Sequence, residues 1–124
     1  MPYVALVVDD SMLIRHTVCR FLEDRGFRVE SAIDGTEALE ILSELRPDII
    51  LTDLQMPRMD GHALIDNIQS KPETATIPIV VLSARNSKPQ DSDDRARCVI
   101  YKDIDIGGQL GRALEAIFPP SPSA

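Results

Sequence analysis

The stretch Ile49-Ile-Leu-Thr52, which runs directly into Asp53, decides the fold expected for this chain. Its large apolar side chains follow one another without the alternation of a half-exposed strand. That pattern is typical of a strand buried on both faces. Ile79-Val-Val-Leu82 repeats it further along the chain. Strands of this kind occur in parallel sheets that carry helices on both faces, so the sequence predicts such a sheet.

On either side of this stretch, short apolar runs alternate with amphipathic stretches, as in successive βαβ units. Strands are predicted at Tyr3–Val8, Phe27–Ala32, Asp48–Thr52, Ile77–Leu82 and Cys98–Tyr101. Helices are predicted at about 11–25, 36–45, 61–70 and 106–118, where apolar residues recur at helical spacing. The expected fold class is α/β, with a doubly wound, five-stranded parallel sheet.

One segment departs from this alternation of predicted strands and helices. Residues 85–97 offer Ala96 as their only apolar side chain and include Pro89 and a run of charges. A helix there has no apolar face to bury, so the segment is predicted to be a loop or at most one or two helical turns. Residues 1–118 are expected to form one domain, and the Pro- and Ser-rich residues 119–124 a disordered tail or the start of a linker.

The composition excludes several classes of function. A net charge of −7 argues against direct binding to nucleic acid, which depends on basic side chains that neutralise phosphates. No apolar run approaches the ~18 residues of a membrane span, and nothing resembles a signal peptide. Cys19 and Cys98 lack a metal-binding spacing and are expected to be reduced and buried. The chain is therefore expected to be cytoplasmic, with no membrane partner.

Reactive side chains gather at the ends of four predicted strands. The first strand ends in Asp9-Asp10 and the third in Asp53, while Ser83 and Lys102 follow the fourth and fifth. Ligands of open parallel sheets bind outside the carboxyl ends of the strands. The sequence therefore predicts one site that combines these residues.

Three carboxylates in one crevice repel one another, and a bound divalent cation removes that conflict. Mg²⁺ prefers carboxylate, carbonyl and water oxygens, which this site offers. An ionised Asp is a competent nucleophile toward phosphorus. Mg²⁺, the ammonium of Lys102 and the hydroxyl of Ser83 are suited to balancing the charge of a transferred phosphoryl group.

Each residue also has a plainer interpretation when taken alone. Asp10 could be a helix N-cap, and Asp53 an exposed turn residue. Ser83 could be a turn or cap residue, and Lys102 a solvated surface lysine. Their joint occurrence at four strand ends favours a common site over these separate interpretations.

The same residues carry a family resemblance. The segments are Val7-Val8-Asp9-Asp10-Ser11 with Arg15, Asp53-Leu-Gln-Met-Pro-Arg-Met-Asp-Gly61, Val80-Val-Leu-Ser83-Ala84, and Lys102. Together they resemble the receiver domain of two-component response regulators, in particular the single-domain, chemotaxis-regulator-like members. The resemblance spans about residues 3–118, and the stretch from Asp53 to Gly61 is its most specific part.

The resemblance implies a flavodoxin-like sheet with strand order 2-1-3-4-5. It implies that Asp53 accepts a phosphoryl group from a sensor histidine kinase or a histidine phosphotransfer protein, and that the signal passes to a downstream protein target. The chain would be a self-phosphorylating acceptor rather than a turnover enzyme. Asp10, Asp53 and the main-chain carbonyl of Gln55 would hold Mg²⁺, with Asp9 acting largely through bound water, and Ser83 and Lys102 would contact the phosphoryl group.

The sequence departs from the family pattern around Lys102. The aromatic residue that reads out phosphorylation belongs three positions before the lysine, where Val99 stands; Tyr101 is predicted to lie in the other register. Asp103 follows the lysine in place of the usual cis proline. The interval from Ser83 to Lys102, 19 positions, is also shorter than usual.

Three other functions are compatible with an α/β fold of this kind. A phosphorylation-independent adaptor with a receiver fold is favoured by the altered readout position. A metal-dependent phosphatase or phosphotransferase usually has a second Asp two residues after its nucleophile, where this chain has Gln55. A flavin-binding protein is disfavoured because the turn Asp9-Asp10-Ser11 repels phosphate.

Overall fold

The computed structural model describes residues 3–56, 59–83, 94–102 and 105–118. Within them, five parallel strands form one sheet in the order β2-β1-β3-β4-β5, which confirms the predicted fold class and strand order. The strands are β1 (Val4–Val8), β2 (Arg28–Ala32), β3 (Ile49–Asp53), β4 (Ile79–Ser83) and β5 (Cys98–Tyr101). The helices are α1 (Met12–Asp24), α2 (Gly35–Leu42), α3 (Gly61–Gln69) and α4 (Ile106–Ile117).

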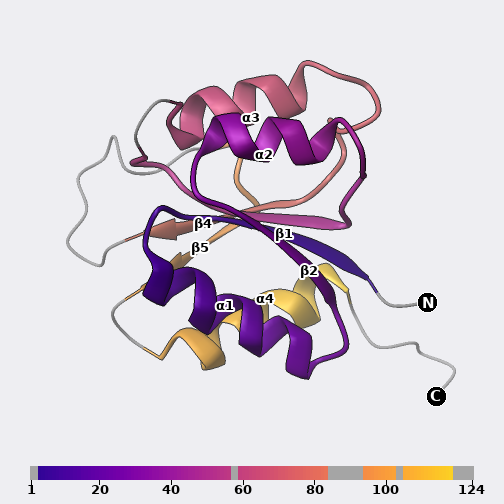
Figure 1. Cartoon of the computed structure of the whole chain (residues 1–124). Helices are drawn as coiled ribbons and strands as arrows, with labels where there is room; N and C mark the ends of the chain where they lie inside the picture. The colour runs from indigo at the N-terminus through magenta and orange to yellow at the C-terminus, as the bar shows by residue number, and fades with distance from the viewer. Residues whose placement is uncertain (1–2, 57–58, 84–93, 103–104, 119–124) are drawn as a thin grey trace, which may run out of the picture.

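Helices cover both faces of the sheet, with α1 and α4 on one side and α2 and α3 on the other (Figure 1). Each face has its own apolar core because side chains alternate along a strand. In β1, Ala5 and Val7 pack toward α1 and α4, whereas Leu6 and Val8 pack toward α2 and α3. β3 and β4 are buried along their whole length, as their unbroken apolar runs predict.

The observed ends of β3 and β4 differ from the predicted ones by one residue, and in both cases that residue is a candidate site residue. β3 extends through Asp53 and β4 through Ser83, so both residues belong to the sheet instead of following it. β4 begins two residues later than predicted, after Pro78, whose carbonyl accepts a hydrogen bond from Ile50. Ser11 caps α1 by accepting a hydrogen bond from Ile14 at 3.3 Å, so the cap is not Asp10.

The connection between β4 and β5 is described only at its end. Residues 94–97 form turns and bends, and most of the segment 85–97, with the prediction made for it, lies outside the described residues. Arg95 pairs with Asp66 of α3, and Ala96 packs against the core beneath α2 and α3. The described end of this connection therefore rests on the α2 and α3 side of the sheet. Residues 103–104 and the predicted tail, 119–124, are also outside the described part.

Both cysteines are free thiols. They are half-buried rather than buried, because Cys19 and Cys98 lie at the margin of the core under α1 and α4. Burial still raises the pKa of each thiol above its ordinary value. No helix in the described part of the chain is long and apolar enough to cross a membrane.

Candidate functional site

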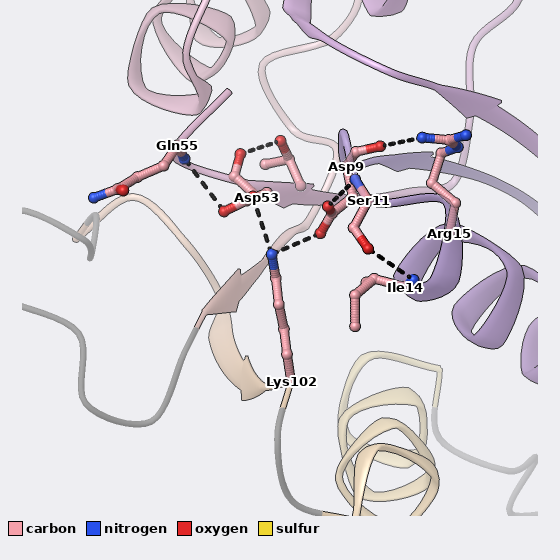
Figure 2. A network of polar contacts seen from close by, with 8 residues as sticks. Asp9, Ser11, Ile14, Arg15, Asp53, Gln55 and Lys102 are labelled. Atoms are coloured by element: carbon pink, nitrogen blue, oxygen red, sulfur yellow. Dashed lines mark hydrogen bonds and ion pairs between the residues drawn. The ribbon is translucent and has the colours of Figure 1, made fainter. Parts of the chain in front are cut away.

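The candidate site lies at the carboxyl edge of the sheet, where the sequence predicts it. Asp9 directly follows β1, and Asp53 is the last residue of β3. Lys102 directly follows β5 and reaches back across the edge of the sheet toward both carboxylates (Figure 2). These three side chains stand at the ends of β1, β3 and β5, which lie far apart in the sequence but end at the same edge of the sheet.

The Lys102 ammonium bridges the two carboxylates. Its Nζ lies 2.8 Å from Asp9 Oδ2 and 3.0 Å from Asp53 Oδ2. The Asp9 side chain is fully buried, while 13% of the Asp53 side chain is exposed. Asp53 is therefore the carboxylate of this pair that an incoming group can reach.

Burial shapes the electrostatics of this bridge. It raises the pKa of the Asp9 carboxyl, and the hydrogen bonds from Lys102 and Ser11 counter that effect only in part. Burial alone lowers the pKa of Lys102, but the hydrogen bonds with Asp9 and Asp53 together outweigh it, so the pKa lies above its ordinary value. Lys102 is thus a fixed positive charge at neutral pH.

Asp10 adds a third carboxylate and is exposed. One oxygen from each of Asp9, Asp10 and Asp53 lies within 4.8 Å of the others, an arrangement that can hold a metal ion. Among the described residues, these three carboxylates face the one ammonium of Lys102, so this part of the site carries an excess of negative charge. Oxygen ligands and that excess charge suit a hard divalent cation such as Mg²⁺.

The loop after β1 is held by its own hydrogen bonds. The backbone N–H of Ser11 donates to Asp9 Oδ1 at 2.9 Å, and Arg15 Nη1 donates to the Asp9 carbonyl at 2.8 Å (Figure 2). Because Arg15 lies on α1, the helix fixes the direction of the chain that carries Asp9 and Asp10. The resemblance includes Arg15, but the sequence alone does not predict this contact.

The backbone around Asp53 is held by hydrogen bonds and by the close approach of α3. Thr52 Oγ1 donates to the Asp53 carbonyl at 2.7 Å, and the Gln55 N–H donates to Asp53 Oδ1 at 3.2 Å. Gly61, at the start of α3, donates its N–H to the Leu54 carbonyl at 2.9 Å. A Cβ at Gly61 would overlap the Asp53 carbonyl and lie 2.7 Å from Leu54 Cα. The glycine of the Asp53-to-Gly61 stretch is therefore required for the close approach of α3.

Ser83 lies at the same edge, buried at the end of β4, and its carbonyl accepts the Lys102 N–H at 2.8 Å. In the sheet register Ser83 is opposite Tyr101. The prediction that Tyr101 lies in a different register from position 99 is wrong, because Val99 and Tyr101 are two positions apart in β5 and so share a face of the sheet. Tyr101 lies on the face of Val99 and is 40% exposed, whereas Val99 is half-buried against the core under α2 and α3.

Two further contributors give no signal in the sequence. Thr52 is a single polar residue in an apolar strand, and its buried hydroxyl is satisfied by the Asp53 carbonyl. Gln109 of α4 forms hydrogen bonds with the backbone of Tyr101, directly before Lys102. A lone threonine or glutamine is not distinctive enough to be assigned to a site from the sequence.

Comparison with known proteins identifies the family of this chain. The family model of the response regulator receiver domain matches residues 5–107. The chain therefore belongs to the receiver domain family of response regulators. A curated relative, the response regulator MprA of Mycobacterium sp. (strain KMS), is 41% identical over 87 residues, which are 70% of this chain and 37% of the relative. The match thus spans little more than a third of that relative's length.

Solved structures share the fold over nearly the whole chain. The chemotaxis response regulator CheY4 of Vibrio cholerae is 30% identical with a TM-score of 0.85, covering 95% of this chain and 100% of CheY4. The receiver domain of the sensor histidine kinase PA1611 from Pseudomonas aeruginosa PAO1 has a TM-score of 0.81 at 23% identity, covering 94% and 97% of the two chains. That structure is described with a magnesium ion coordinated in its active-site cleft.

Proposed function

We propose that this chain is a phospho-acceptor signalling switch in which Asp53 receives a phosphoryl group. The observation that carries the proposal is the Lys102 ammonium held between Asp53 and the buried Asp9 at the carboxyl edge of the sheet. This arrangement presents an accessible carboxylate beside a fixed positive charge. The carboxylate can attack a phosphorylated donor, and the positive charge speeds that attack by balancing the charge on the transferred phosphoryl group.

The phosphoryl donor is a phosphohistidine of a sensor histidine kinase or of a histidine phosphotransfer protein. One Asp53 oxygen attacks phosphorus, so a new O–P bond forms while the N–P bond of the donor breaks. The electron pair of that bond leaves with the imidazole nitrogen, which takes up a proton. Lys102 balances the charge on the phosphoryl oxygens, and the Ser83 hydroxyl donates a hydrogen bond to one of them.

The acidic cluster fits Mg²⁺, with Asp9, Asp10, Asp53 and the main-chain carbonyl of Gln55 as the groups that would hold it directly or through water. When bound, the ion neutralises the carboxylates and the oxygens of the phosphoryl group. The magnesium described for the PA1611 receiver domain supports this assignment.

The chain passes the signal on through protein contacts. It consumes one donor phosphoryl group per event and loses it by slow hydrolysis, so it is a switch and not a turnover enzyme. The test is incubation with acetyl phosphate and Mg²⁺, followed by intact-mass measurement. The proposal expects one added phosphoryl group in the wild type and none in Asp53→Asn. An unchanged level of label in Asp53→Asn would refute it.

A second candidate, a phosphorylation-independent adaptor, is favoured by one observation. Val99 stands at the position of the family's aromatic readout residue. Because valine is aliphatic, it has no ring to reorient, and its side chain is half-buried against the core. The two functions differ in how the chain binds a partner. A switch changes its partner affinity when beryllofluoride mimics the phosphoryl group, whereas an adaptor binds equally with and without it.

A further inference from the structure

The side chain of Gln109 occupies the place of a neighbouring strand at the outer edge of β5. Its Oε1 accepts the Tyr101 N–H at 2.9 Å, and its Nε2 donates to the Tyr101 carbonyl at 2.9 Å. A carboxamide carries one donor and one acceptor side by side, as a peptide group does. Gln109 therefore satisfies both main-chain groups of one strand residue with a single side chain.

The position of Tyr101 gives this contact its importance. Among the described strands, β5 is the last of the sheet, so the outward-facing groups of its backbone have no described strand beside them. The next residue, Lys102, faces the opposite way and donates its N–H to the Ser83 carbonyl at 2.8 Å. The dipeptide Tyr101–Lys102 is thus held by Gln109 on one side and by β4 on the other.

Gln109 is itself fixed within the first turn of α4. Asp105 caps this helix with a backbone φ of 37°, in the left-handed region, and its side chain accepts the Gly108 N–H at 3.2 Å. The Gln109 N–H donates to the Asp105 carbonyl at 3.2 Å. Because α4 packs on the sheet through the buried Leu110, the glutamine is attached to a rigid element.

We propose that Gln109 is a positioning residue that holds Lys102 in register with Asp53 through the backbone of Tyr101. The proposal rests on the proposed function in one respect, namely that Lys102 supports phosphoryl transfer to Asp53. Its geometric part stands independently, since it concerns only the order of the chain at the end of β5. A long lysine side chain points accurately only when its own main chain is fixed, and small displacements of a reacting group cost large factors in rate.

The simpler alternative is that Gln109 only protects a strand edge or stabilises α4. These roles are distinguished by whether the effect of losing Gln109 depends on Lys102. A residue that acts through Lys102 has no further effect on phosphoryl transfer once Lys102 is removed. A residue that only stabilises the fold has the same effect in both backgrounds.

The experiment uses Gln109→Met, which keeps the length of the side chain and removes both hydrogen bonds, and Gln109→Glu, which keeps only the acceptor. Glu115→Ala, an exposed change on the same helix, is the control. Initial rates of Asp53 phosphorylation by acetyl phosphate are measured at saturating Mg²⁺ in the wild-type and Lys102→Ala backgrounds. Amide hydrogen exchange is measured at Tyr101 and Lys102 in the same proteins.

We expect Gln109→Met to slow phosphorylation by roughly tenfold with Lys102 present and to leave the rate unchanged in Lys102→Ala. Exchange at both amides should rise by roughly tenfold or more. Gln109→Glu should lie between wild type and Gln109→Met, and Glu115→Ala should match wild type. Equal slowing in both backgrounds, or unchanged exchange at Lys102, overturns the positioning role. Absence of phosphorylation in the wild type would instead refute the proposed function, and the exchange measurements would still decide whether Gln109 orders Lys102.

Discussion

Gly61→Ala tests how the packing of α3 against the end of β3 positions Asp53. The new Cβ would overlap the Asp53 carbonyl oxygen, lie 2.7 Å from Leu54 Cα and lie 2.8 Å from Leu54 Cδ2. Ordinary contacts of this kind begin near 3.4 Å, so the start of α3 and the end of β3 must separate by roughly 0.7 Å or more. Two of the three obstacles are main-chain atoms, which cannot turn aside as a flexible side chain can.

Overpacking of a dense core typically costs about 1–3 kcal/mol, and obstruction by the main chain places Gly61→Ala near the upper end. Against a total stability of about 5–15 kcal/mol, the loss is substantial. For a domain of this size it lowers Tm by roughly 10 °C. Because Asp53 itself is displaced, the rate of phosphorylation should fall as well.

Thermal unfolding followed by far-ultraviolet circular dichroism measures this effect, since the chain contains no tryptophan for fluorescence. The matched control is Gly111→Ala in the interior of α4, where the new Cβ would meet only the far end of the Arg25 side chain, at 3.3 Å, which a small rotation of that long side chain relieves. Replacing a helical glycine by alanine there should stabilise the protein by up to about 1 kcal/mol. The reasoning fails if Gly61→Ala melts at or above the wild-type temperature, or if the two variants shift Tm in the same direction.

Three further predictions follow from the acidic cluster and the thiols. Mg²⁺ should raise Tm, because it relieves carboxylate repulsion in the folded state alone. Asp10→Asn should weaken Mg²⁺ binding measured by calorimetry, and an unchanged affinity would place the ion elsewhere. Asp9 has a raised pKa in the fold, so its contribution to stability is present below its unfolded value of 3.8 and is lost as pH rises through the folded pKa. Asp9→Asn should therefore become more favourable relative to wild type between about pH 3 and pH 7 in Mg²⁺-free melts, and the opposite trend would contradict the cause assigned to the shift. Alkylation of Cys19 and Cys98 by iodoacetamide near pH 8 should be much slower in the native protein than in urea, because burial raises both pKa values; equal rates would show that the thiols are freely exposed.

The strands could be predicted because burial on both faces leaves a direct trace in the sequence. An unbroken apolar run such as Ile79-Val-Val-Leu82 is too short for a helix and too apolar for a surface loop, and its length matches the observed strand closely. The meeting of Asp9, Asp53 and Lys102 could also be predicted, since parallel strands end at one edge of their sheet. In these cases, topology converts distant sequence positions into neighbours without knowledge of side-chain packing.

The contacts that orient those residues could not be predicted in the same way. Arg15 reaches the Asp9 carbonyl and Gln109 reaches the backbone of Tyr101 through long side chains whose direction depends on helix docking. The half-buried position of Cys98 depends likewise on how far α4 covers β5. Such details follow from tertiary packing, and single residues carry no periodic signal that reports it.

The central claim, that Asp53 is the phospho-acceptor, is tested most directly by locating the modified residue. After reaction with acetyl phosphate and Mg²⁺, borohydride reduction converts an aspartyl phosphate to homoserine, and peptide mapping by mass spectrometry identifies its position. The geometry at the edge of the sheet, where Asp53 is the accessible partner of Lys102, predicts homoserine at position 53 alone. Homoserine at position 9 or 10, or label that resists reduction and lies on another residue type, would contradict it.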